Sequence, residues 1–183
     1  MQCPKDREIE LVDGWLSDQL AVQHCPQCQG NWIPPTEYQR WRGEPPNVIE
    51  VPQQMLNVKC EPSPNDAQGA LCPACGCFLS RAKVALRTPF YVERCSNCGG
   101  IWCDRGEWEI LEMLGLHVAI EQLFSSDWQS RVKEVELANR ERQATIDKLG
   151  EGLALRVFEL AELLEQHPNG DFGVAYLMRR FDE

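Results

Sequence analysis

The chain has 183 residues, of which 43% are hydrophobic and 25% are charged. This composition indicates a folded globular protein, and the length suffices for one ordinary domain or two small ones. The N-terminal residues lack the apolar core of a signal peptide, and no run approaches the roughly 18 apolar residues of a membrane span. We therefore expect a cytoplasmic protein without a membrane span. The net charge of −10 opposes binding to polyanions, so protein partners are favoured over nucleic acid.

Ten cysteines would predict a disulfide framework in a secreted protein. Without an export signal, the reducing cytosol favours metal-bound thiolates or buried thiols. Five of the ten cysteines lie in two copies of one motif, CPQCQGNWIPPTEY at 25–38 and CSNCGGIWCDRGEW at 95–108. Two cysteines, a glycine, a tryptophan and a glutamate agree at a constant offset of 70. The sequence therefore predicts a duplicated unit.

The first unit spans residues 1–43. Cys3 and Pro4 open it, and the segments IELV and LAVQHC are candidate strands of a hairpin. The pair Asp13-Gly14 between them is a turn signal. After the motif, Pro34 and Pro35 lead into TEYQRWRG, which predicts one short helix ending at Gly43.

Residues 44–71 form a connector with five prolines in 28 residues, too interrupted for a regular element. We expect it to act as a spacer draped over the second unit. That unit spans residues 72–106 and contains the segments FLSRAKVAL and PFYVERC. They predict two strands joined by a short turn near Arg87 and Thr88.

The second unit carries two Cys-x-x-Cys pairs separated by nineteen residues. Each tight turn supplies two thiolates and the hairpin brings the turns together, which is what a tetrahedral zinc ion requires. Gly99 and Gly100 let the backbone turn closely around the sulfurs. A dithiol redox centre is disfavoured, because that role needs one pair opening a helix in a βαβ setting. The predicted zinc ligands are Cys72, Cys75, Cys95 and Cys98.

The first unit has an aspartate where the second has a cysteine, so its candidate ligands are Cys3, Asp6, Cys25 and Cys28. A carboxylate is an admissible zinc ligand, although it is harder and rarer in structural sites than a thiolate. His24 and Cys60 are alternatives for the fourth position. The first unit could also be a degenerate copy of the second that binds no metal and is held by its core alone.

Residues 107–183 are predicted to be helical and hold 8 basic and 16 acidic side chains. Asp104 and Glu107 are spaced as a helix cap and its acidic partner. The first helix continues through WEILEMLGL at helical period. A second helix is expected from Ser125 and Ser126 to Gly150, followed by helices in LALRVFELAELLEQ and DFGVAYLMRRF. We expect a helical hairpin or small bundle, whose amphipathic helices offer a means of oligomerisation.

The order CPxC, hairpin, CxxCxGxW and D-x-G-E resembles the zinc ribbon of the transcription factor IIB zinc-finger type. Residues 72–108 carry CPAC, CSNCGGIW and DRGEW, and the first unit resembles a degenerate second copy. Members of this family mostly lack an assigned biochemical role. The resemblance implies zinc, and it does not imply DNA binding.

The remaining motif residues have structural interpretations. Trp32 and Trp102 are expected as aromatic lids over their hairpins, and Cys77 and Cys103 as small buried residues. The two motif glutamates lie where a helix begins, which favours a cap or dipole role. No nucleophile, base and orienting group come together in the sequence, so we expect no enzyme.

The predicted fold is a small α+β protein, with two zinc-ribbon hairpin units followed by an α-helical C-terminal region. The predicted function is a non-enzymatic zinc-binding scaffold for another protein. The alternative is a transcription-associated factor that contacts RNA polymerase or nucleic acid through Arg81, Lys83 and Arg87 beside Phe90 and Tyr91. Residues 72–106 have a local charge of +3, which falls to about +1 when four thiolates and one Zn²⁺ are counted. This is not the usual electrostatic footprint of nucleic-acid binding.

Overall fold

The computed structural model describes residues 1–17, 19–52, 55, 58–61, 63–84 and 87–181. They form a small α+β fold, as predicted. The strands are β1 (Val12–Leu16), β2 (Leu20–His24), β3 (Asn31–Ile33), β4 (Leu79–Val84), β5 (Phe90–Cys95) and β6 (Ile101–Cys103). The helices are α1 (Pro35–Arg42), α2 (Glu107–Met113), α3 (Ile120–Leu123), α4 (Ser126–Leu149), α5 (Glu151–Gln166) and α6 (Gly170–Phe181).

All six strands form one antiparallel sheet in the order β1-β2-β3-β6-β5-β4. Each unit contributes a hairpin and a third short strand, and the units join where β3 pairs with β6. In that pair Trp32 lies opposite Trp102, flanked by Asn31 opposite Cys103 and Ile33 opposite Ile101. Adding 70 to the number of each β3 residue gives the equivalent residue of β6. Exchanging the two units therefore reproduces the same three residue pairs. The sheet therefore has a pseudo-twofold axis at the tryptophan pair.

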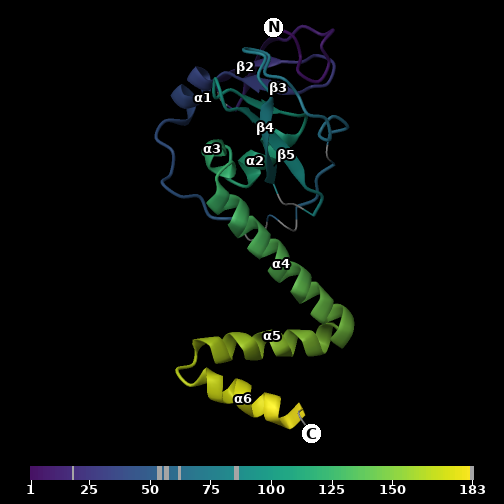
Figure 1. Ribbon diagram of the computed structural model, residues 1–183, viewed down its shortest axis with the longest axis vertical. Helices are drawn as coiled ribbons and strands as arrows, with labels where there is room; N and C mark the ends of the chain where they lie inside the picture. Colours follow the sequence, from purple (N-terminus) through teal and green to yellow (C-terminus); the bar gives the residue numbers. More distant parts are fainter. Residues whose placement is uncertain (18, 53–54, 56–57, 62, 85–86, 182–183) are drawn as a thin grey trace. The chain divides into compact units, whose positions relative to one another are not determined.

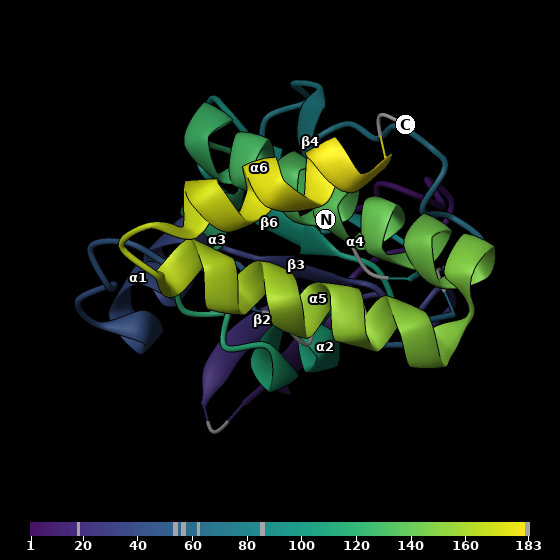
Figure 2. The same cartoon turned by 90° about the horizontal axis from the view of Figure 1, so that it is seen from below.

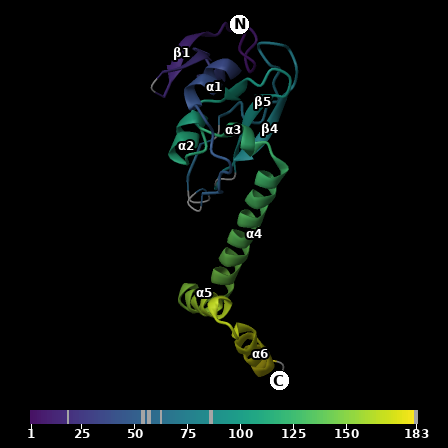
Figure 3. The same cartoon turned by 90° about the vertical axis from the view of Figure 1, so that its left-hand side faces the viewer.

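One face of the sheet packs against helices, and the opposite face carries Trp32, Trp102 and the two cysteine clusters. Helices α1, α2 and α3 lie together beside the sheet (Figures 1 and 3). Their buried side chains, including Tyr38, Leu111 and Ile120, share a core with strand residues such as Ile33 and Ile101. The connector also contributes to this core through Ile49 and Met55, which are buried. It therefore packs against the fold as well as linking the two units.

The first hairpin begins and turns later than predicted, because its first strand β1 covers 12–16 and shares only Val12 with the predicted strand IELV at 9–12. Asp13 and Gly14 lie inside β1, where they pair with Gln23 and Val22. The chain reverses after Ser17, whose φ is 27°, and residue 18 lies outside the described residues. The turn predicted at Asp13-Gly14 is thus wrong. Gly14 instead gives room to the neighbouring strand, because a Cβ there would lie 3.1 Å from the Cβ of His24.

The other predicted elements fall close to their expected positions. Strands β4 and β5 lie within the two predicted segments, with Arg87 and Thr88 in the bend between them. Helix α1 begins at Pro35 and is followed by Gly43, whose φ is 64°. At the start of α4, the Ser125 hydroxyl accepts the amide N–H of Trp128. The short elements β3, β6 and α3 were not predicted.

The chain packs as two compact units, residues 1–134 and 135–183. The C-terminal compact unit, residues 135–183, contains the end of α4 together with α5 and α6, which run beside each other (Figure 2). The domain boundaries predicted from the sequence, 1–43, 44–71, 72–106 and 107–183, stay a prediction. The two compact units are defined by how densely residues pack, which does not show which segments fold independently. No helix in the described part of the chain has both the length and the apolar character needed to cross a bilayer.

Candidate metal centres

The four cysteines of the second unit come together as predicted, with their sulfur atoms all within 4.8 Å of one another. Cys72 and Cys75 lie on the turn before β4, Cys95 ends β5 and Cys98 lies in the turn before β6. The Sγ–Sγ distances are 3.6 Å for Cys72–Cys98 and 3.4 Å for Cys75–Cys95. A zinc ion bound tetrahedrally by thiolates separates its sulfurs by about 3.8 Å. The cluster therefore fits a zinc ion.

The backbone wraps around the sulfurs in the same way in both units. The amide N–H of Cys98 donates to the sulfur of Cys95 over 3.5 Å, and that of Cys28 donates to Cys25 over 3.4 Å. The residue after the last cysteine of each turn has a left-handed backbone conformation, with φ of 82° at Gly99 and 61° at Gln29. Glycine is favoured at such a position, so Gly99 has the predicted role in the turn.

In the first unit three sulfurs come together, those of Cys3, Cys25 and Cys28. The Cys3–Cys28 distance is 3.6 Å, equal to that of the matching pair in the second unit. The Asp6 carboxylate does not belong to this group in the described structure. Its Oδ1 accepts the Glu8 amide N–H at 3.3 Å, while the Asp6 amide N–H donates to the Cys3 sulfur at 3.4 Å.

The two alternatives for a fourth ligand are also occupied elsewhere. His24 Nδ1 lies 2.9 Å from Asn31 Oδ1, and Cys60 packs against the helical core rather than the cysteine side of the sheet. Within the described residues, neither belongs to the group of three sulfurs. The first centre therefore offers three thiols, with its fourth position not assigned by the geometry.

Each cluster contains one thiol that ionises easily. A hydrogen bond from Cys28 lowers the pKa of Cys3 to about 6, and the same contact raises the pKa of Cys28. A hydrogen bond with Asn97 lowers the pKa of Cys75 to about 6, whereas burial raises the pKa of Cys72. Because the thiolate is the form that binds metal, each cluster has a sulfur prepared for a cation.

The two motif tryptophans are structural, but each covers the opposite unit. Trp32 and Trp102 are 1% and 0% exposed. A Cβ on Gly100 would lie 2.1 Å from the Trp32 ring, and one on Gly30 would lie 2.2 Å from the Trp102 ring. The predicted lid over the tryptophan's own hairpin is corrected to a reciprocal exchange between units. Gly100 gives the Trp32 ring the space for this contact, and its carbonyl also accepts the Cys95 amide N–H at 2.9 Å in the cysteine turn.

The remaining predictions for motif residues have mixed outcomes. Cys103 is buried as predicted, whereas Cys77 is exposed beside the turn that holds Cys72 and Cys75, where its carbonyl accepts the Cys72 amide N–H at 2.7 Å. Glu107 acts as a cap, since its Oε2 accepts the Asp104 amide N–H at 2.8 Å. The Asp104 carboxylate does not cap the helix and instead accepts the Trp102 indole N–H at 2.7 Å.

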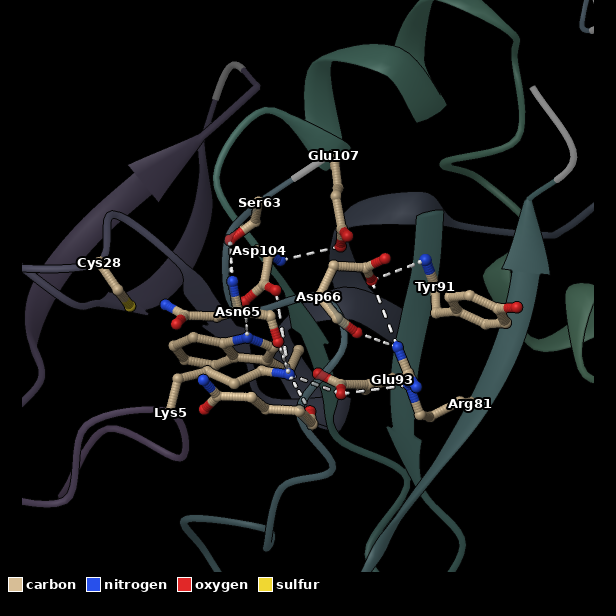
Figure 4. A network of polar contacts seen from close by, with 12 residues as sticks. Lys5, Cys28, Ser63, Asn65, Asp66, Arg81, Tyr91, Glu93, Asp104 and Glu107 are labelled. Atoms are coloured by element: carbon tan, nitrogen blue, oxygen red, sulfur yellow. Dashed lines mark hydrogen bonds and ion pairs between the residues drawn. The ribbon is translucent and has the colours of Figure 1, made fainter. Parts of the chain in front are cut away.

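A buried lysine beside the first cluster was missed by the sequence analysis. The Lys5 side chain is 0% exposed, and its ammonium group contacts Glu93 at 2.7 Å (Figure 4). It also donates to the backbone carbonyls of Asn65 at 3.2 Å and Gln68 at 2.7 Å. It thereby joins the first cysteine turn to the connector and to β5. Nothing in the local pattern CPKD distinguishes this lysine from a solvated one.

Residues 2–42 match a family described as transcription factor zinc-finger, a zinc ribbon of the TFIIB type. The match covers the unit whose motif departs further from the family pattern. The second unit is supported by its motif and by its cluster of four thiols. No curated protein and no solved structure matches the chain.

Proposed function

We propose that this chain is a non-enzymatic protein that binds zinc at both cysteine clusters and serves as a scaffold for contact with another protein. The zinc assignment is supported by the family match over residues 2–42 and by sulfur distances suited to a tetrahedral ion. Four thiolates close the coordination sphere of the second centre, which is typical of a structural site. The protein-binding assignment rests on the hairpin of α5 and α6 in the C-terminal compact unit, residues 135–183.

A groove between α5 and α6 carries this part of the proposal. Its volume is about 670 Å³, and its apolar lining includes Val157, Leu160, Leu164, Val174, Leu177 and Met178. Met178 is 62% exposed and Val174 is 46% exposed. The helices approach closely because Gly173 lacks a side chain, since a Cβ there would lie 2.5 Å from a methyl carbon of Leu164. A contiguous exposed apolar groove on a charged protein marks an interaction site.

The charges around the groove indicate what kind of segment it binds. Glu165 and Asp171 belong to its lining, and α5 also carries Glu159 and Glu162. An amphipathic protein segment with an apolar face and flanking basic residues would complement both features. We propose such a segment of a partner protein as the occupant.

The test compares two substitutions on the same helix. Met178 lines the groove and Phe172 does not, although both are large, apolar and exposed. Zinc-loaded wild-type protein, Met178→Lys and Phe172→Lys are used to capture partners from native lysate, with quantification by mass spectrometry. We expect a partner retained by wild type and Phe172→Lys and lost with Met178→Lys. Equal capture by all three proteins would contradict the assignment of the groove, and concentration-dependent dimerisation of the purified wild type would identify a second copy as the occupant.

A transcription-associated role is the second candidate, and the description of the matching family favours it. Direct contact with nucleic acid through β4 and β5 has weaker support. Arg81 lies over the Tyr91 ring at 4.3 Å and pairs with Asp66 and Glu93, while Phe90 is buried in the core. Binding of DNA or RNA that weakens steeply with salt would favour this candidate, and absence of binding at low salt would leave only contact with the polymerase protein.

A further inference from the structure

Three buried carboxyl groups meet outside the cysteine clusters. Asp66 belongs to the connector, Asp104 follows β6 and Glu107 is the first residue of α2. They are 7%, 3% and 1% exposed, and each offers an oxygen within 4.8 Å of the others. Figure 4 shows the Glu107 carboxylate directed toward the other two. Three separate segments of the chain thus present oxygen ligands to one point.

The basic groups near this cluster do not balance its charge. Lys5 contacts Glu93 at 2.7 Å and Asp104 at 3.9 Å, and Arg81 contacts Asp66 at 3.4 Å and Glu93 at 3.6 Å. With Glu107, the network contains four carboxylates and these two basic side chains. Two negative charges therefore remain uncompensated when all carboxylates are ionised. Burial makes such an excess costly unless protons or a cation neutralise it.

One oxygen of the cluster has no hydrogen-bond donor. Glu107 Oε2 accepts the Asp104 amide N–H, but Oε1 is buried without a hydrogen-bond partner among the described residues. Leaving a buried acceptor unpaired costs free energy, so unpaired groups of this kind are uncommon in folded proteins. A cation between the carboxylates would satisfy this oxygen.

The ribbon fold does not itself require the acidic cluster. By the offset of 70, Pro34 and Glu37 take the places of Asp104 and Glu107 in the first unit. Glu37 lies at the surface, where it pairs with Arg40 at 2.7 Å. The first unit forms its strands and helix without buried acids at these positions. The acidic cluster is thus a specific feature of one side of the pseudosymmetric sheet.

We propose that Asp66, Asp104 and Glu107 bind one hard divalent cation of the Mg²⁺ and Mn²⁺ class. Carboxylate oxygens without sulfur or imidazole are ligands suited to these ions. One such ion would neutralise the two excess charges and hold the connector against β6 and α2. Mg²⁺ normally keeps several water ligands, which would complete its coordination sphere here.

A proton is the competing occupant. Burial, together with the negative charge of Asp104, raises the pKa of Glu107 well above its usual range. A protonated Glu107 would donate a hydrogen bond within the cluster and remove part of the excess charge. The experiment must therefore distinguish a bound cation from a neutral carboxylic acid.

The test titrates zinc-loaded protein with Mn²⁺ near neutral pH and measures free Mn²⁺ by electron paramagnetic resonance. We expect one Mn²⁺ per chain, displaced by Mg²⁺, with the zinc content unchanged. Glu107→Gln should weaken binding by at least about tenfold, because it removes one ligand charge. Glu109→Gln alters an exposed acid two residues along the same helix and should bind Mn²⁺ as wild type does.

Two results would overturn the proposal. One is the absence of bound Mn²⁺ on the wild-type protein, which would assign the cluster to a shared proton. The other is equal Mn²⁺ affinity of wild type and folded Glu107→Gln. If that variant does not fold, Asp66→Asn replaces it, and the wild-type titration still decides whether the cation binds.

Discussion

Lys5 illustrates how one side chain can connect both halves of the sheet. Lysine is almost never fully buried unless it is paired, and its ammonium group carries three donors. Here the ammonium group contacts Glu93 and two backbone carbonyls of the connector. The charge is therefore both paired and hydrogen-bonded, which offsets the cost of removing it from water.

Replacing this lysine should destabilise the fold severely. Lys5→Met leaves Glu93 buried without its shortest ion pair, and we expect the free energy of unfolding to fall by about 3 kcal/mol. Urea denaturation of zinc-loaded protein measures the change. Arg7→Met, which alters an exposed basic residue two positions away, should change stability by less than about 0.5 kcal/mol. If Lys5→Met were as stable as Arg7→Met, the buried contacts would not stabilise the sheet.

At the scale of elements, β3 and β6 join the two units although each has only three residues. So short a pair is held by side-chain packing more than by its few hydrogen bonds. The tryptophan of each strand packs over the glycine of the opposite unit, at Gly30 and Gly100. The motif CxxCxGxW thus encodes both halves of a self-complementary contact, the ring and the space that receives it.

Adding a methyl group to this space should weaken the joint between the units. In Gly100→Ala the new Cβ would lie 2.1 Å from the Trp32 ring, so the ring must move. We expect a loss of about 2 kcal/mol of stability, measured by thermal and urea unfolding of zinc-loaded protein.

Gly69→Ala is the matched control, because a Cβ there meets nothing within 4 Å. The double variant Gly100→Ala with Trp32→Leu should cost less than the sum of the two single changes, because the smaller side chain makes room for the methyl group. Strict additivity in this cycle would show that the two residues do not interact.

At the scale of the whole molecule, the duplication places two centres with different ligand sets in one sheet. The second cluster offers four soft sulfur ligands, whereas the first offers three and has an aspartate at the matching position in sequence. Metal binding contributes directly to folding stability in sites of this kind. The centres should therefore differ in affinity while supporting the same fold.

We predict up to two zinc ions per chain and stepwise release during titration with a chelator. The ion at Cys3, Cys25 and Cys28 should leave first, because three thiols of the chain converge there and four converge at the second cluster. Asp6→Cys should tighten this centre and Asp6→Ala should loosen it, as measured by metal analysis at each chelator concentration. A single zinc per chain, unaffected by Cys25→Ser, would mean that the first ribbon is retained for its shape. A lower zinc content in Cys60→Ser would identify a different fourth ligand.

The sequence by itself determined the features that depend on local pattern. Cysteine spacing predicted which sulfurs meet at Cys72, Cys75, Cys95 and Cys98, and the helical period predicted α4, α5 and α6. These predictions succeed because a tight turn fixes the distance between two thiols, and because an amphipathic helix repeats its pattern over many residues. The repeat at an offset of 70 likewise predicted two units of the same design.

Only the tertiary structure decided how the two units meet. The pairing of β3 with β6 and the burial of Lys5 depend on contacts between residues about 70 to 90 positions apart, which no local pattern specifies. The same holds for Glu107, whose position predicted a helix cap but whose burial beside Asp66 depends on the path of the connector. Burial and charge balance are properties of the packed molecule, because they are set by what the rest of the chain places around each side chain.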